Sequence, residues 1–278
     1  MGDDDARRGE AAEAADAEPS APREPLPIVF ADEHYVAIDK PAGLLVHRTS
    51  MAKEDDPGDY ALQRLRDQLG ARVYPVHRLD RPTSGLVLFG RSSEAARRLA
   101  AAFEARAVAK RYLAVVRGYA PEAARIDSPV PAREGKDAPK RPALSDLRRL
   151  ATVELPIAVG RYATARYSLV ELRPHSGRWR QLRRHCAHLR HPIVGDTSHG
   201  DGRHNQLFRD EFSAHRLLLV AEGLALRHPF SGEPLRLRVA PDPALALLFA
   251  KLGWTWPALA EFDVPDAPAP VENEPPSV

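Results

Sequence analysis

The stretch that most constrains this chain is residues 74–90, where a polar turn is followed at once by a short apolar run. Arg81-Pro82 and then Thr83-Ser84-Gly85 predict a turn, because proline fixes its own φ, disfavours helix at the residue before it, and glycine accepts positive φ. Residues 86–90 predict a buried strand. Asp80 is therefore expected on an irregular segment held by a strand, where protein scaffolds often carry reacting groups.

Asp80 is crowded by His77, Arg78 and Arg81. Neighbouring cations are expected to stabilise the ionised form of this carboxylate. An isolated Asp-Arg pair is equally typical of a turn cap or a structural ion pair, so these residues alone do not define a reaction.

The net charge of the whole chain is small, but the region between its two acidic ends is strongly basic. Residues 1–25 carry eight acidic side chains and three arginines, and residues 261–278 carry five acidic side chains, five prolines and no basic residue. We therefore predict disordered tails at 1–25 and 263–278 around one domain at 26–262. The formal charge of +2 becomes about +12 over residues 26–260, which favours a polyanionic partner.

The basic residues are 34 arginines and six lysines. Guanidinium groups bind phosphates in a forked geometry and stack on bases, although a GC-rich coding bias explains the arginines equally well. The single cysteine, Cys186, excludes an intrachain disulfide and a cysteine-based zinc site, which fits a reducing compartment. No apolar run reaches membrane-spanning length and the acidic start is unlike a secretory signal, so we expect a cytoplasmic protein.

Apolar spacing predicts both strands and helices in the body of the chain. Strands are expected at residues 28–40 (a pair around an Asp32-Glu33 turn), 110–118, 161–172, 215–220, 224–229 and 234–239. Helices are expected at 60–69 with Asp59 as N-cap, after Ser92, from Ser176 as N-cap, and at 242–256. Residues 119–150 are rich in proline and charge, and we expect them to cross the domain as a long irregular segment.

Three histidines, His185, His188 and His191, are spaced by three residues and raise the question of a metal site. Pro192 ends the helix at once, and no glutamate accompanies them as in H-E-x-x-H. Phosphate contact or histidines with satisfied hydrogen bonds is the preferred interpretation, and we predict no metal.

Residues 77–85, HRLDRPTSG, resemble the HRLD-x-x-TSG signature of the RluA family of pseudouridine synthases, in which the aspartate is catalytic. DKPAGLLVH at 39–47 resembles the opening motif of the same family, and the resemblance covers roughly residues 28–240. It implies an α+β pseudouridine synthase fold: a mixed, mainly antiparallel sheet with flanking helices around a basic cleft. It also implies that Asp80 is the catalytic residue.

The K-x-Y pattern at Lys110 and Tyr112 resembles the second motif of the family, whose tyrosine lies against the target base. By itself, a tyrosine at the start of a strand is typical of half-buried core with a satisfied hydroxyl. The resemblance favours Tyr112 as an active-site residue.

Residues 176–185, SGRWRQLRRH, resemble the TGR-x-HQLR-x-H motif, in which the arginine after Gln-Leu pairs with the catalytic aspartate. This implies that Arg183 lies against Asp80. Two positions depart from the motif, Ser176 in place of threonine and Arg180 in place of histidine.

HPIVGD at 191–196 resembles a further segment of the family, and 195–205 resembles the loop that distinguishes the TruC-type branch, the tRNA pseudouridine-65 synthases. A glycine-rich loop with Arg203 and His204 is suited to grip a nucleic-acid backbone, and a solvent-exposed turn explains it as well. The RNA-binding residues that we expect are His77, Arg78, Arg81, Lys110, Arg178, Gln181, Arg203 and His204.

The function implied is isomerisation of a uridine in tRNA, at position 65, by an enzyme without cofactor or metal. Neither G-x-G-x-x-G nor a P-loop is present. An rRNA-directed synthase of the same family, a catalytically silent RNA-binding module and a metal-dependent hydrolase remain as alternatives. tRNA is the expected partner, with no protein partner and no appended RNA-binding domain, and a monomer is favoured.

Overall fold

Strands outnumber helices in the part of the chain that the computed structural model describes, residues 24–47, 59–135, 137–257 and 263–265. The strands are β1 (Ile28–Ala31), β2 (Tyr35–Lys40), β3 (Tyr74–Pro75), β4 (Ser84–Gly90), β5 (Val108–Arg117), β6 (Ala123–Asp127), β7 (Val130–Pro131), β8 (Lys140–Arg141), β9 (Leu144–Leu155), β10 (Ala165–Pro174), β11 (Leu219–Arg227) and β12 (Pro234–Arg238). The helices are α1 (Ala61–Leu69), α2 (Ser93–Glu104), α3 (Gln181–His188), α4 (Gly202–Phe212) and α5 (Pro243–Lys251). The predicted tails fall almost wholly outside these described residues.

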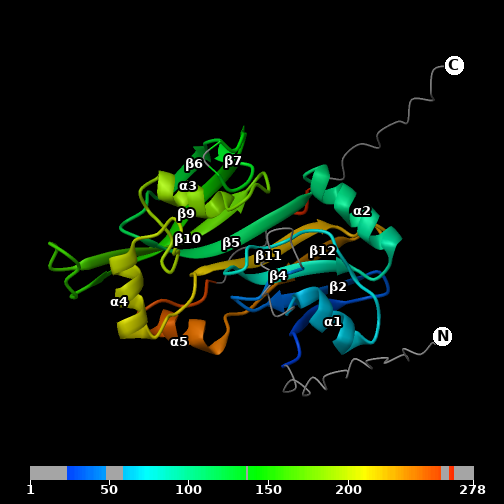
Figure 1. Cartoon of the computed structure of the whole chain (residues 1–278), viewed down its shortest axis with the longest axis horizontal. Coiled ribbons are helices and arrows are strands. Elements are labelled where there is room, and N and C mark those ends of the chain that lie inside the picture. Colours follow the sequence, from blue (N-terminus) through cyan, green and yellow to red (C-terminus); the bar gives the residue numbers. More distant parts are fainter. Residues whose placement is uncertain (1–23, 48–58, 136, 258–262, 266–278) are drawn as a thin grey trace, which may run out of the picture.

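One ten-stranded sheet organises the fold, with strand order β1-β2-β4-β11-β5-β10-β9-β6 and with β12 on β11 and β3 on β4 (Figure 1). β7 and β8 form a separate ribbon. All the strand pairs are antiparallel except β4 with β11, where Ser84 and Gly85 lie opposite Val220 and Ala221. The expected mixed, mainly antiparallel sheet with flanking helices is confirmed.

The parallel pairing depends on Gly85. Its φ is +111°, and a Cβ atom there would lie 2.3 Å from the carbonyl oxygen of Ala221. Only a residue without a side chain allows both this backbone conformation and so close an approach. The glycine that follows the Asp80 turn is therefore what lets a distant segment of the chain lie directly beside it.

Several predicted elements are confirmed. β1 and β2 flank a turn in which Asp32 Oδ1 accepts hydrogen bonds from the backbone N–H groups of His34 and Tyr35. Ser92 is the N-cap of α2, and its hydroxyl accepts from the N–H of Ala95 at 3.1 Å. The apolar run after Gly85 forms the fully buried strand β4.

Two predicted helix caps were wrong. Asp59 does not cap α1: the N-cap is Tyr60, and the Asp59 carboxylate instead forms an ion pair with Arg64. Ser176 does not begin α3, because the backbone turns through a left-handed Arg180 before the helix starts at Gln181. The Ser176 hydroxyl donates to the side-chain oxygen of Gln181 and accepts from the N–H of Leu144.

The segment 119–150 was also misjudged. It contains β6, β7, β8 and the start of β9, so proline and charge interrupt strands there instead of preventing them. The predicted strand at 161–172 begins only at Ala165, since the residues before it form the connection between β9 and β10. The predicted loop around Arg203 is the first turn of α4, and its N-cap Asp201 accepts from the N–H of Arg203.

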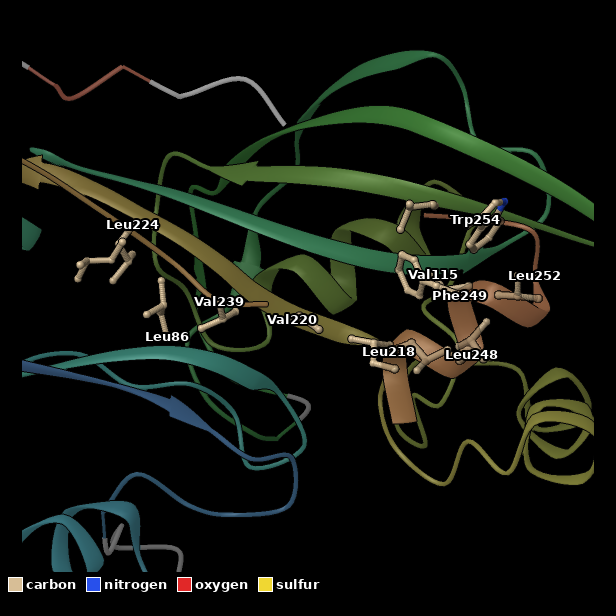
Figure 2. Packing of buried hydrophobic residues seen from close by; sticks show 14 of the residues in the cluster. Leu86, Val115, Leu218, Val220, Leu224, Val239, Leu248, Phe249, Leu252 and Trp254 are labelled. Carbon is tan, nitrogen blue, oxygen red and sulfur yellow. The ribbon is translucent and has the colours of Figure 1, made fainter. Parts of the chain in front are cut away.

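Apolar side chains cover both faces of the sheet. Alternate residues of β4 separate the two sides: Leu86 and Leu88 pack with α2, α4 and α5, whereas Val87 and Phe89 pack with α1. Figure 2 shows the first side, where α5 presents Leu248 and Phe249 near β5 and β11. Burying one such side chain fully stabilises the fold by roughly 1.5–3 kcal/mol. The opposite face also carries α3, which packs on β5 and β10.

Arg111 lies between Lys110 and Tyr112 in the sequence, yet it points to the other side of β5. Its Nε donates to Glu222 Oε2 at 2.6 Å with both side chains fully buried, and Arg238 donates to the other Glu222 oxygen at 2.7 Å. Because successive strand residues point to opposite faces, one short stretch supplies both an internal ion pair and residues of the opposite surface. No helix in the described residues is long and apolar enough to span a membrane.

Candidate active site

A cleft of about 690 Å³ lies where the turn before β4, the first half of β5, the end of α2 and the start of α3 meet, and we call it the Asp80 cleft. Its size is within the range of small-ligand pockets. Two carboxylates line it, those of Asp80 and Glu104. The cationic lining residues are Arg78, Arg106, Lys110, Arg178, Arg180 and Arg183.

The turn that carries Asp80 is tied to the end of β2. Gly43 and Arg81 exchange two hydrogen bonds: the N–H of Gly43 donates to the Arg81 carbonyl at 2.8 Å, and Arg81 Nε donates to the Gly43 carbonyl at 2.9 Å. The fully buried Lys40 donates to backbone carbonyls, including that of Leu44 at 2.7 Å. Burial lowers the pKa of Lys40 to about 7. The motif at residues 39–47 therefore holds the Asp80 turn through hydrogen bonds, but its residues do not line the cleft.

Arg183 joins two carboxylates. Its Nη1 lies 3.2 Å from Asp80 Oδ2, while Nε and Nη2 each donate to Asp196 at 2.8 Å. The Arg183 side chain is 4% exposed and that of Asp196 1%, whereas Asp80 is 20% exposed toward the cleft. A buried guanidinium needs a compensating charge, and Asp196 supplies it. Asp80 is thus left with one arginine contact and an open side.

Tyr112 lines the same cleft, and its side chain packs against the buried apolar residues beneath α1 and also against those beneath α3. Burial raises the pKa of the Tyr112 phenol well above its ordinary value, and the charge of Asp80 raises it further. The phenol is therefore neutral at any physiological pH. It can stack on a base, donate a hydrogen bond, or relay a proton, but it does not act as a preformed phenolate.

Two of the expected RNA-binding cations, Arg78 and Lys110, line the cleft with little or no pairing in the described residues. Within the described residues, the exposed side chain of Arg78 forms no hydrogen bond or ion pair. Lys110 donates a long hydrogen bond of 3.4 Å to the Ser176 carbonyl, and burial followed by the charge of Arg106 lowers its pKa to about 8. Both residues were expected to bind RNA, and both are placed where a phosphate could reach them.

Two other expected RNA-binding residues line the cleft but are engaged by the fold. His77 Nε2 accepts from the N–H of Leu88 at 2.9 Å, its ring stacks on Phe103, and burial lowers its pKa to about 3. It is a neutral ring that offers no charge to a phosphate. Gln181 is 4% exposed, and its amide bonds Ser145, Ser176 and two backbone groups.

The remaining expected contacts differ in position. Arg178 lines the Asp80 cleft and donates from Nε to the Pro142 carbonyl at 3.3 Å. Arg81 is exposed but is used to hold Gly43 and is not among the lining residues. Arg203 and His204 line a different groove, beside the connection between β9 and β10. The sequence prediction had placed all of these in one RNA-binding set.

The structure adds residues that the sequence prediction missed. Trp179 lines the cleft, and two guanidinium groups lie over its ring, that of Arg180 at 4.5 Å and that of Arg184 at 4.8 Å from the ring centroid. Arg180, the departure from the family motif, adopts a left-handed backbone with φ of 51°. Asp196 belongs to a segment that had been noticed, but its role as the partner of Arg183 is visible only in the fold.

The spaced histidines do not form a site. The two ring nitrogens of His185 lie 3.0 Å from the Ser145 hydroxyl and from the Ser128 carbonyl, and His191 bonds the Arg117 carbonyl. Across the residues that the structure describes, no cluster of three or more potential metal-ligating side chains is found. Hydrogen bonds engage His185 and His191 within the fold.

A profile of the RNA pseudouridylate synthase family matches residues 34–188, which include Asp80, Tyr112 and Arg183. The match spans more than half of the chain, and the chain belongs to this family.

Comparison with named relatives indicates which members of this family the chain is similar to. The chain is 48% identical over 237 residues to tRNA pseudouridine synthase C of Vibrio cholerae, covering 82% of this chain and 96% of that protein. It is 46% identical over 237 residues to tRNA pseudouridine synthase C of Vibrio parahaemolyticus, with the same coverage. Among solved structures, human RNA pseudouridylate synthase domain containing 1 superposes with a TM-score of 0.63 at 27% identity, covering 83% of this chain and 89% of that chain.

Proposed function

We propose that this protein is a tRNA pseudouridine synthase and that it converts the uridine at position 65 into pseudouridine. The family match and the names of the bacterial relatives support a tRNA substrate. The resemblance of residues 195–205 to the TruC-type loop supports position 65. The observation that carries the proposal is the contact of Asp80 with Arg183 at 3.2 Å inside a nucleotide-sized cleft.

The reaction is an isomerisation. The bond between uracil N1 and ribose C1′ breaks, the base turns, a bond forms between C5 and C1′, the C5 proton leaves and N1 gains one. Nothing is oxidised and no group is carried away, so the chemistry requires no redox carrier. It requires a carboxylate able to act at C1′, at the base, or as a proton acceptor at C2′, and Asp80 is that carboxylate.

Arg183 acts on Asp80 by charge. An unpaired carboxylate in a dry pocket is costly, and a fixed guanidinium stabilises the ionised form that the reaction needs. Asp196 holds this guanidinium through two hydrogen bonds of 2.8 Å. Arg183 is thus already oriented before the substrate enters.

Tyr112 covers the target base and handles the C5 proton in this proposal. Its raised pKa means that the hydroxyl keeps its own proton in the resting enzyme. Proton removal from C5 through Tyr112 therefore proceeds as a relay, with the phenol passing on its proton as it accepts another. A neutral aromatic ring also stacks on uracil without a charge penalty.

The target uridine must leave its stack before Asp80 can reach it, at a cost of a few kcal/mol. Arg78, two residues before Asp80 and unpaired within the described residues, is placed to occupy the space that the uridine leaves. His77 stiffens this segment by its bond to Leu88 and its stacking on Phe103.

The test is incubation of purified protein with an unmodified tRNA transcript and with rRNA fragments, followed by mapping of pseudouridine. We expect one new pseudouridine in tRNA, at position 65, and none with the Asp80→Asn variant. Modification confined to rRNA would support the rRNA-directed alternative, and tight tRNA binding without any pseudouridine would support a silent binding module. Inactivation by a chelator would contradict the metal-free mechanism.

A further inference from the structure

A second groove, of about 800 Å³, lies beside the connection between β9 and β10 and the start of α4, and we call it the hairpin groove. Four arginines line it and one carboxylate, that of Asp201. They are Arg117, Arg161, Arg166 and Arg203. The groove takes no part in the chemistry proposed above, because Asp80, Tyr112 and Arg183 all line the other cleft.

The arginines are not all neutralised within the fold. Arg117 donates to Asp201 at 2.5 Å, and Arg166 lies 3.3 Å from Glu154. Arg161 bonds only the hydroxyl of Tyr162, at 2.9 Å, in the described structure, and the side chain of Arg203 there has no hydrogen bond or ion pair. Two guanidinium groups are thus available to an anion at the groove.

Aromatic rings are exposed beside these guanidinium groups. Tyr162 is 60% exposed, and Arg161 lies 5.1 Å from its ring centroid. Tyr119 is 44% exposed but does not line the groove; its hydroxyl donates to Glu154, and the paired Arg166 lies 5.5 Å from its ring. Exposed aromatics next to arginines form the stacking and phosphate-binding surface that unpaired nucleotides use. An acidic protein segment would use the guanidinium groups but would leave the exposed rings without a partner.

The backbone makes room for one of these arginines. Gly160 has φ of +61°, and a Cβ there would lie 2.7 Å from Nη1 of Arg203. Arg203 therefore rests directly over the tip of the connection between β9 and β10. His204 has a different role, because its Nδ1 lies 2.8 Å from the hydroxyl of Tyr167 and burial lowers its pKa. It anchors α4 to the sheet, while Arg203 faces the groove.

The two clefts lie at opposite ends of the same strand pair. Lys110 and Pro174 line the Asp80 cleft, whereas Arg117 and Ala165 line the hairpin groove. A ten-residue strand spans about 30 Å. Since Leu172 lies opposite Tyr112 and strand residues alternate, Arg166 points to the same face of the sheet as Tyr112. Arg117 lies opposite Tyr167 and points to the other face, where Tyr167 contacts α4, so the hairpin groove lies at the end of the strand pair with residues from both faces. An RNA molecule that occupies both clefts therefore spans about 30 Å and passes around this end of the sheet.

We propose that the hairpin groove is a second binding surface for the substrate RNA, where Arg161 and Arg203 hold backbone phosphates and Tyr162 stacks on an unpaired base. This inference rests on the proposed function, because it takes tRNA as the ligand. It extends that function by giving the enzyme two separate contacts with one tRNA, one at the target uridine and one far from it.

The test is hydroxyl-radical footprinting and affinity measurement with an unmodified tRNA transcript, comparing the wild type with the double variant Tyr162→Ala, Arg203→Ala. We expect two separate protected segments with the wild type and loss of one of them with the double variant. The affinity should fall about tenfold or more, since stacking and phosphate contacts are both removed.

The control variant is Arg97→Ala, which removes an exposed arginine of α2 outside both clefts. An unchanged footprint in the double variant, or a uniform weakening of all protections, would overturn the proposal. Footprinting needs no turnover, so the two proposals fail separately. A protein that protects two segments without forming pseudouridine contradicts the proposed function alone.

Discussion

Arg183 and Asp196 form a two-pronged ion pair, with both hydrogen bonds at 2.8 Å, which leaves only Nη1 of the arginine to contact Asp80. The pair is almost completely buried, and Asp196 also accepts from the backbone N–H groups of Ser198 and His199. The cation that faces the candidate catalytic carboxylate is therefore positioned by the protein and not by the substrate.

Replacing Asp196 with asparagine should damage both stability and activity. A buried guanidinium would lose its compensating charge, at a cost of about 3–5 kcal/mol, and Tm should fall by roughly 10 °C. Thermal unfolding and single-turnover rates check this, with Asp210→Asn, an exposed change on α4, as the control. Unchanged activity in Asp196→Asn would show that Arg183 needs no fixed orientation.

Replacing Asp80 with asparagine should leave RNA binding intact and abolish turnover. The amide keeps the shape of the side chain but cannot act as a nucleophile or a base, and we expect a rate loss of about 10²–10⁴-fold or more. The rate is measured by release of tritium from tRNA labelled at uracil C5, and the affinity by gel shift. Turnover near the wild-type rate would end the assignment of Asp80.

Replacing Tyr112 with phenylalanine separates its two proposed roles. The ring remains for stacking, so the Kd for tRNA should stay within about twofold. Loss of the hydroxyl removes the proton relay, and kcat should fall by about 10²–10⁴-fold. Because burial raises the pKa of the Tyr112 phenol, a plot of the wild-type rate against pH should show no change from ionisation of Tyr112 near neutral pH. Full activity of the variant would restrict Tyr112 to stacking.

Replacing Arg78 with alanine should affect paired targets most. If this arginine occupies the space left by the flipped uridine, its loss raises the cost of opening a duplex but not of binding a loose strand. Rates are compared for the same uridine in a duplex arm and in a single-stranded oligonucleotide. Equal losses on the two RNAs would argue that Arg78 contributes only phosphate contact.

Lys110 should make RNA affinity depend on pH. Its pKa is lowered to about 8, so the cation present at pH 7 is largely lost by pH 9, and affinity should weaken over that interval. The contribution of Lys110 to stability changes in the opposite direction. Between pH 8 and the ordinary lysine pKa of 10.5, Lys110 binds more protons in the unfolded chain than in the folded protein. Its contribution to the free energy of unfolding therefore rises with pH over this interval. Titrations of Lys110→Met and of Lys140→Met, an exposed control on β8, test the assignment.

Local signals predicted the parts of the fold that depend on neighbouring residues. Ser92 as a cap, the turn at Asp32 and the buried run of β4 all follow from short-range rules. The caps assigned to Asp59 and Ser176 failed because longer-range partners, Arg64 and Gln181, engage those side chains instead. The strands within 119–150 were missed because pairing with partner strands, not propensity, makes them strands: β9 pairs with β10 and β6, and β7 pairs with β8.

The candidate site likewise contains residues that local motifs predicted and contacts that only the fold reveals. Asp80, Tyr112 and Arg183 were predicted from motifs and do line one cleft, and their catalytic roles remain predictions. The pairing of Asp196 with Arg183 depends on how α3 meets the loop after it, which no local spacing reveals. The contacts of Trp179 with Arg180 and Arg184 are local, but the motif comparison had singled out Arg180 only as a departure. The separation of Arg203 from the Asp80 cleft required the registers of β5 and β10.

The parallel contact of β11 with the residues around Gly85 has a consequence for biosynthesis. β11 lies between β4 and β5 in the sheet, although about 130 residues separate it from β4 in the chain. A ribosome must therefore release most of the polypeptide before the middle of the sheet can close. Until then the strand that follows the Asp80 turn lacks its parallel partner, so the candidate catalytic carboxylate reaches its final position only late in synthesis.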